Sequence, residues 1–125
     1  MTALELRDGW LMPAAVIPKH FEQWLEEAVE HIEAALPFVK QRRVAVQAGG
    51  ILGIWPRMLA EDYGFKNVYT FEPDPTNFKC LFQNTDEFLA VTPFDCGLGS
   101  APGVVRWSRA SDHKPGWHTV APDHC

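Results

Sequence analysis

A glycine-rich turn between an apolar segment and a helical pattern constrains the fold of this chain more than any other feature. The turn occupies residues 47–53, and its glycines are Gly49, Gly50 and Gly53. Residues 44–46 before it are all apolar, which predicts a short, fully buried strand. Residues 54–63 after it predict a helix, with Gly64 as its left-handed cap. A strand, a glycine turn and a helix in this order open a βαβ unit.

A second unit follows the first directly. Residues 67–72 are rich in β-branched and aromatic types and predict a strand that stops at Pro73. Asp74 is the expected N-cap of the next helix, with Pro75 at its first position and an end near Asn84. Strands that alternate with helices form a parallel sheet with right-handed crossovers, so the sequence predicts an α/β fold.

Two further strands are expected downstream. Residues 88–92 predict the third strand, residues 95–103 a loop, and residues 104–107 the fourth strand. Residues 108–125 are polar, contain proline and histidine, and show no periodic signal.

The segment before the glycine turn divides into an arm and a helix. In residues 1–17 the apolar positions have no clear period and two prolines break any long helix, so we expect an arm that packs on the domain. Residues 19–36 place apolar side chains at intervals of three and four, which predicts an amphipathic helix. The predicted units are residues 1–40, the N-terminal arm and helix, and residues 41–125, a partial α/β domain.

Composition and charge limit the classes of function. The 125 residues are 46% apolar and 22% charged, enough to bury a core without disulfides or a structural metal. The formal charge of -5 comes with no basic stripe, so nucleic acid is not an expected partner.

Several sequence features bear on the location of the protein. The longest strongly apolar stretch, residues 44–56, is too short to span a bilayer, so no membrane partner is expected. Three separated cysteines without a CxxC pair indicate a reducing compartment. Acidic residues also stand where a signal peptide carries basic ones. These features favour a cytoplasmic location.

The glycine turn and the end of the second strand carry the chemistry. Glycines let backbone N–H groups approach a ligand; the alternative is that they only let helix and strand pack closely. Glu72 follows Gly49 by twenty-three residues and ends the second strand. A carboxylate there accepts hydrogen bonds from both ribose hydroxyls when an adenosine lies across the strand ends, which favours a ligand site.

Two motifs resemble those of the FkbM-type S-adenosylmethionine-dependent methyltransferases. They are residues 44–53 and residues 68–78, and in the second the run Phe-Glu-Pro-Asp-Pro, followed by Asn77, is the more specific part. The resemblance covers residues 44–103. It implies a Rossmann-like parallel sheet, S-adenosylmethionine as methyl donor, and transfer to a hydroxyl oxygen of a small molecule or glycan. Residues 41–125 then form a partial S-adenosylmethionine-binding domain.

The resemblance assigns cofactor contacts to Gln47, Gly49, Gly50, Gly53, Glu72 and Asp95. The glycines would line the methionine part, Glu72 would hold the ribose, and Asp95 would accept from the adenine amino group. Gln47 stands where the family usually has Asp, so it can hydrogen-bond the cofactor's ammonium without a negative charge, and weaker binding is expected. Ile51 stands where the family often has Asn and removes a polar contact.

A hydroxyl acceptor needs a base near its oxygen, and no base is assigned from these motifs. His118 is the best candidate by chemistry and by the family-like loop around it; the alternative is a surface histidine in a tail. A metal site is not expected, because His113, His118, His124 and Cys125 lack compact ligand spacing. Trp55 can contact a ligand or complete the core.

Three functions are compatible with these patterns. The first is an O-directed, S-adenosylmethionine-dependent methyltransferase. The second is a non-catalytic binding or interaction module that keeps the fold, which Gln47, Ile51 and the missing C-terminal part favour. The third, a nicotinamide-dinucleotide binder, is disfavoured because Ile51 interrupts the G-x-G-x-x-G spacing.

The number of predicted strands is itself informative. A methyltransferase sheet of this type has more strands than are predicted here, so we expect an N-terminal fragment, a truncated fold or a domain that a partner chain completes. An incomplete sheet exposes a strand edge and an apolar face, which predicts self-association.

Overall fold

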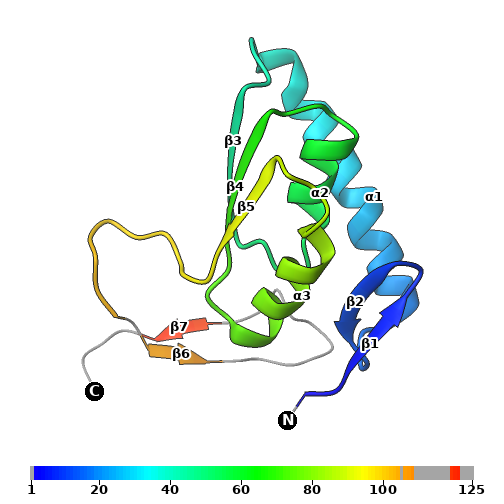
Figure 1. The fold of residues 1–125 in the computed structure, drawn as a ribbon, viewed down its shortest axis with the longest axis vertical. Helices are drawn as coiled ribbons and strands as arrows, with labels where there is room; N and C mark the ends of the chain where they lie inside the picture. Colours follow the sequence, from blue (N-terminus) through cyan, green and yellow to red (C-terminus); the bar gives the residue numbers. More distant parts are fainter. Residues whose placement is uncertain (1, 105, 109–118, 122–125) are drawn as a thin grey trace.

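The computed structural model describes residues 2–104, 106–108 and 119–121. Figure 1 shows a small sheet with helices beside it and a hairpin near the N-terminus. The elements in chain order are β1 (Leu4–Arg7), β2 (Trp10–Pro13), α1 (Pro18–Ala35), the 3-10 helix η1 (Leu36–Phe38), β3 (Val44–Ala48), α2 (Ile54–Glu61), β4 (Asn67–Phe71), α3 (Pro75–Thr85), β5 (Val91–Phe94), β6 (Arg106–Ser108) and β7 (Thr119–Ala121).

Three parallel strands in the order β3-β4-β5 form the central sheet. Ala45 pairs with Val68, and Val68 pairs with Val91. Helix α2 connects β3 to β4 and α3 connects β4 to β5, as parallel strands require. The three helices lie on the same side of the sheet (Figure 1). The α/β fold with a parallel sheet, predicted from the sequence, is confirmed.

Local signals set the limits of the helices as predicted. Asp74 caps α3, because its side chain accepts a hydrogen bond from the backbone N–H of Asn77 at 2.9 Å. Pro75 follows at the first position of that helix, where its missing N–H costs nothing. Gly64, just beyond α2, has a φ of +69°, which is the conformation of a left-handed cap.

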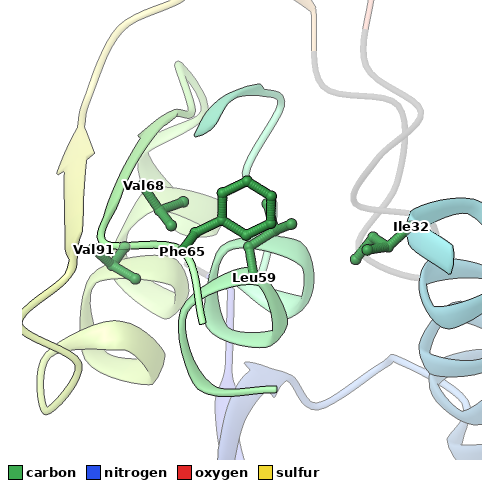
Figure 2. Close-up of a cluster of buried hydrophobic side chains, with 5 residues drawn as sticks. All are labelled: Ile32, Leu59, Phe65, Val68 and Val91. Carbon is green, nitrogen blue, oxygen red and sulfur yellow. The ribbon is translucent and has the colours of Figure 1, made fainter. Parts of the chain in front are cut away.

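The main hydrophobic core lies between the sheet and the helices (Figure 2). It joins α1, α2, β4, β5 and the segment between α2 and β4 through five buried residues: Ile32, Leu59, Phe65, Val68 and Val91. Complete burial of one such side chain contributes roughly 1.5–3 kcal/mol to folding. This cluster holds α2 against the strands and fixes the turn that precedes it.

The N-terminal arm is a β-hairpin, an element that the sequence analysis did not predict. Strands β1 and β2 pair antiparallel through a two-residue turn at Asp8 and Gly9, whose φ angles are 50° and 83°. Two positive φ angles in succession are typical of a type I′ turn, for which Asp-Gly is a favoured sequence. The dipeptide was therefore the signal for this hairpin.

The hairpin packs on the domain, as expected of the arm. Asn84 of α3 accepts a hydrogen bond from the backbone N–H of Leu11 at 2.7 Å and donates to the carbonyls of Leu11 and Leu52 at 2.8 and 2.7 Å. A second core cluster lies beneath this contact and contains Met12, Val16, Leu52 and Cys80. The hairpin thus holds α3 and the residues just before α2 in place.

The prediction that residues 44–46 are fully buried is wrong. Val44 and Val46 are 54% and 63% exposed, because β3 lies at the edge of the sheet and its alternate residues face away from the helices. The register places further apolar side chains on this same side. We call it the bare face and define it by Val44, Val46, Ala48, Tyr69, Phe71 and Phe94. No described helix covers it.

The third strand begins later than predicted, at Val91 in place of residue 88. The backbone N–H of Phe88 donates to the carbonyl of Thr85 at 3.0 Å, and the N–H of Val91 donates to the carbonyl of Phe88 at 2.9 Å. These bonds form a turn after α3 that delays the strand. The half-buried side chain of Phe88 packs against the main core from this turn.

The predicted fourth strand, residues 104–107, does not extend the parallel sheet. The observed strand is β6, and it pairs antiparallel with β7 in a separate two-stranded sheet. Strand β7 lies in the tail that showed no periodic signal. His113, His118, His124 and Cys125 lie outside the described residues.

Two cysteines fall within the described residues, and neither forms a disulfide there: Cys80 is buried and Cys96 is exposed. The described part of the chain contains no helix long and apolar enough to cross a membrane.

Candidate functional site

The turn between β3 and α2 has an unusual backbone. Gly49, Ile51 and Gly53 all have positive φ, at 75°, 53° and 93°. Glycine adopts this conformation without strain, but the β-branched side chain of Ile51 does so at a cost in free energy. The contacts around Ile51 must therefore maintain this strained backbone conformation of the turn.

Gly50 is required by close packing. A Cβ atom at this position would lie 2.5 Å from Oγ1 of Thr70 and 2.8 Å from Cδ2 of Leu81. Gly53 is also crowded, with Thr85 Cγ2 at 3.1 Å from a built Cβ, whereas Gly49 has open space around it. Gly50 and Gly53 thus allow the close packing of helix and strand that was the alternative to ligand binding.

The amides of the turn are directed into the protein. The N–H groups of Gly49 and Gly50 both donate to the carbonyl of Phe71, at 2.8 and 3.0 Å. The N–H of Ile51 donates to Oε1 of Glu72 at 2.9 Å. These three N–H groups therefore fasten the turn to the end of β4, and the contact of the glycines with a ligand stays a prediction.

The side chain of Glu72 connects this turn to the turn after β4. It is only 3% exposed, and its second oxygen, Oε2, accepts from the backbone N–H of Asp74 at 2.9 Å. Burial raises the pKa of the Glu72 carboxyl, and the N–H bonds from Asp74 and Ile51 oppose that rise. One carboxylate thus joins the β3–α2 turn to the β4–α3 turn. Its contact with a ribose stays a prediction.

Gln47 uses its side-chain amide within the turn. Its Oε1 accepts from the hydroxyl of Thr70 at 2.7 Å, and its Nε2 donates to the carbonyls of Ala48 and Gly49 at 3.0 and 2.9 Å. Thr70 is fully buried and was not singled out from the sequence. These contacts give Gln47 a local structural role, and its bond to an ammonium group stays a prediction.

Asp95 lies at the same end of the sheet as Glu72. It is exposed and follows directly after β5, whose last residue accepts a hydrogen bond from the backbone N–H of Glu72 at 3.0 Å. Its hydrogen bond to an adenine amino group stays a prediction. Of the predicted contacts, Gly49 and Gly50 line the pocket described next, whereas Gln47, Gly53, Glu72 and Asp95 do not.

A pocket of about 230 Å³ lies between α1 and the glycine turn. Its lining comes from two sides: Trp24, Glu27 and His31 on α1, and Gly49, Gly50, Ile51, Leu52, Ile54 and Trp55 on the turn and α2. It lies beyond the carboxyl end of β3, where open α/β sheets bind their ligands. The α1 residues were missed from the sequence; their spacing of three and four, which places them on one helix face, was the available signal.

Comparison with known proteins establishes the fold. No family model matches the sequence, and no curated protein does. A solved structure, M. jannaschii TYW2 in complex with AdoMet, is similar to this chain with a TM-score of 0.52 and 22% sequence identity. The similarity covers 76% of this chain and 43% of that one, so the chain spans less than half the length of the structure it matches. The described part of the chain thus has a Rossmann-like α/β fold, which it shares with a protein solved in complex with AdoMet.

Proposed function

We propose that this chain is the cofactor-binding half of an S-adenosylmethionine-dependent methyltransferase of the FkbM type, directed at a hydroxyl of a small molecule or glycan. The observation that carries the proposal is the pocket between α1 and the glycine turn, at the carboxyl end of β3. The fold shared with a protein solved in complex with AdoMet supports it.

The proposed contacts follow the sequence motifs. Gly49, Gly50 and Gly53 lie along the methionine part of the cofactor, with Gln47 near its ammonium group. Glu72 and Asp95 lie at the strand ends, next to the ribose and the adenine. The transfer is an in-line displacement at the sulfonium methyl, so the residues of this half act by positioning the donor.

A dinucleotide is the weaker candidate ligand. Phosphate-binding turns present free backbone N–H groups to the anion. The N–H groups of Gly49, Gly50 and Ile51 are already used by Phe71 and Glu72. The turn therefore lacks the anion cradle that a pyrophosphate needs.

Calorimetric titration with S-adenosylmethionine, S-adenosylhomocysteine and NAD tests this proposal. We expect saturable binding of the first two and none of NAD. Asp95→Ala, which removes the acceptor, should weaken binding about fivefold, because one hydrogen bond is worth about 1 kcal/mol. Asp86→Ala, an exposed change beyond the C-terminal end of α3, is the matched control and should have no effect. No binding of either adenosyl ligand at millimolar concentration contradicts the proposal.

A non-catalytic binding or interaction module is the second candidate. The internal hydrogen bonds of Gln47 and the strained, apolar Ile51 favour it. The two candidates separate in one assay, in which the chain is incubated with labelled S-adenosylmethionine and a panel of hydroxyl acceptors. Methyl transfer supports the enzyme, and binding without transfer supports the module.

We also propose that a second copy or a completing partner chain covers the bare face, and that the protein is cytoplasmic. Parallel sheets occur almost only with both faces covered. The exposure of Val44 and Val46 supports an association through this face. Light scattering after size exclusion should show a self-associated species, and Val46→Lys should shift it toward the monomer. A wild-type monomer at all concentrations contradicts self-association.

A further inference from the structure

The α1 side of the pocket differs in chemistry from the glycine turn opposite. We call Trp24, Glu27 and His31 the α1 wall; all three line the pocket from one helix. Trp55 lines it from α2, and its ring centroid lies 6.3 Å from that of His31. Two indoles, an imidazole and a carboxylate therefore line the space above the turn.

The charge of this lining is unusual for a glycine-turn site. Among the described residues that line the pocket, Glu27 is the carboxylate, and no lysine or arginine is present. The nearby amides of Gly49, Gly50 and Ile51 donate within the protein and do not attract an anion. Indole faces and a carboxylate both attract positive charge. Glu27 and the two tryptophans of this lining therefore favour a cationic group over an anionic one.

We propose that Glu27, Trp24 and Trp55 recognise positive charge on the ligand, and so favour S-adenosylmethionine over S-adenosylhomocysteine. The inference rests on the proposed function. The donor carries a sulfonium. When an acceptor hydroxyl oxygen bonds to the methyl carbon and gives up its proton, the S–C bond breaks, its electron pair stays on sulfur, and the product is a neutral thioether. A pocket that attracts the cation binds the donor and releases the spent product.

Calorimetry on three chains tests the inference: the wild type, Glu27→Gln and Glu26→Gln. The last two remove the same charge from adjacent, exposed positions of α1, but only Glu27 lines the pocket. We expect Glu27→Gln to weaken binding of the donor about fivefold and of the product less than twofold. Glu26→Gln should change neither.

A second variant tests the aromatic part. Trp55→Phe keeps an aromatic ring, but phenyl binds cations less strongly than indole. It should lower the ratio of donor to product affinity, and circular dichroism will show whether the fold is kept. An unchanged ratio in a folded Trp55→Phe chain overturns the role of the indole.

The outcomes separate this inference from the proposed function. If the wild type binds both ligands and Glu27→Gln behaves like Glu26→Gln, or weakens both ligands equally, the charge selection is overturned and the proposed function stands. If the wild type binds neither ligand, the proposed function is overturned and this inference with it.

Discussion

The two faces of the parallel sheet differ in what covers them. One face of the sheet is turned toward the three helices, and we call it the helix side. Its residues Val68 and Thr70 are completely buried, whereas on the bare face Val44 and Val46 are 54% and 63% exposed. The helix side also carries the hydrogen bond from the hydroxyl of Thr70 to Gln47, the last polar residue before the glycines of the turn. The difference teaches that the described helices cover one face of the sheet, beside the pocket at the glycine turn, and leave the other face bare.

The largest expected difference comes from one substitution made on each face. Val68→Ala leaves a cavity in the main core and should reduce the free energy of unfolding by about 2–3 kcal/mol. Val46→Ala, the matched change on the bare face, should alter it by less than about 0.5 kcal/mol. Urea denaturation of both variants at a concentration that keeps the chain monomeric measures this. Equal losses would show that the two faces do not differ in energy.

A smaller effect is expected where the helix side approaches the glycine turn. Gly50→Ala would place a Cβ atom 2.5 Å from Thr70 Oγ1, so we expect a loss of about 1–3 kcal/mol from overpacking. Gly103→Ala is the control, because no atom lies within 4 Å of its built Cβ. Thermal denaturation compares the two. If both variants melt like the wild type, the close packing described for Gly50 is incorrect.

The smallest effect concerns pH. Burial raises the pKa of Glu72 above its ordinary value of 4.5, against the opposing N–H bonds from Asp74 and Ile51. The folded state then holds this proton more tightly than the unfolded chain. The contribution of Glu72 to stability is therefore complete below pH 4.5 and is lost as pH rises through the raised pKa.

The stability difference between wild type and Glu72→Gln isolates this contribution. Measured by urea denaturation over a pH series, it should move against the wild type as pH rises through that window. Glu87→Gln, at an exposed position, supplies the baseline. A difference that is constant, or that moves toward the wild type, contradicts the raised pKa.

The sequence predicted the order of β3, α2, β4 and α3 because the signals involved are local. Periodicity, the cap at Asp74 and the left-handed Gly64 each act within a few residues. The burial of β3 was predicted wrongly because an all-apolar segment does not show whether its strand lies at the centre or at the edge of a sheet. Exposure depends on which other elements reach the strand, and local pattern does not contain that.

Only the part of the candidate site that depends on local sequence was predicted. Gly49 and Gly50 do line a pocket, but the α1 wall comes from a segment about twenty residues upstream, and only the tertiary fold brings it there. The internal contacts of Glu72 were also not predicted. Its position at a strand end was evident, while its two internal N–H bonds depend on how the neighbouring turns are held.

Hydrogen exchange with and without S-adenosylmethionine tests the central claim most directly, that this chain alone forms the cofactor site. The account predicts saturable protection of amides on both sides of the pocket, in residues 24–31 of α1 and in residues 51–55. The bare face should show no change. Absence of saturable protection, or protection confined to the bare face, would contradict the account.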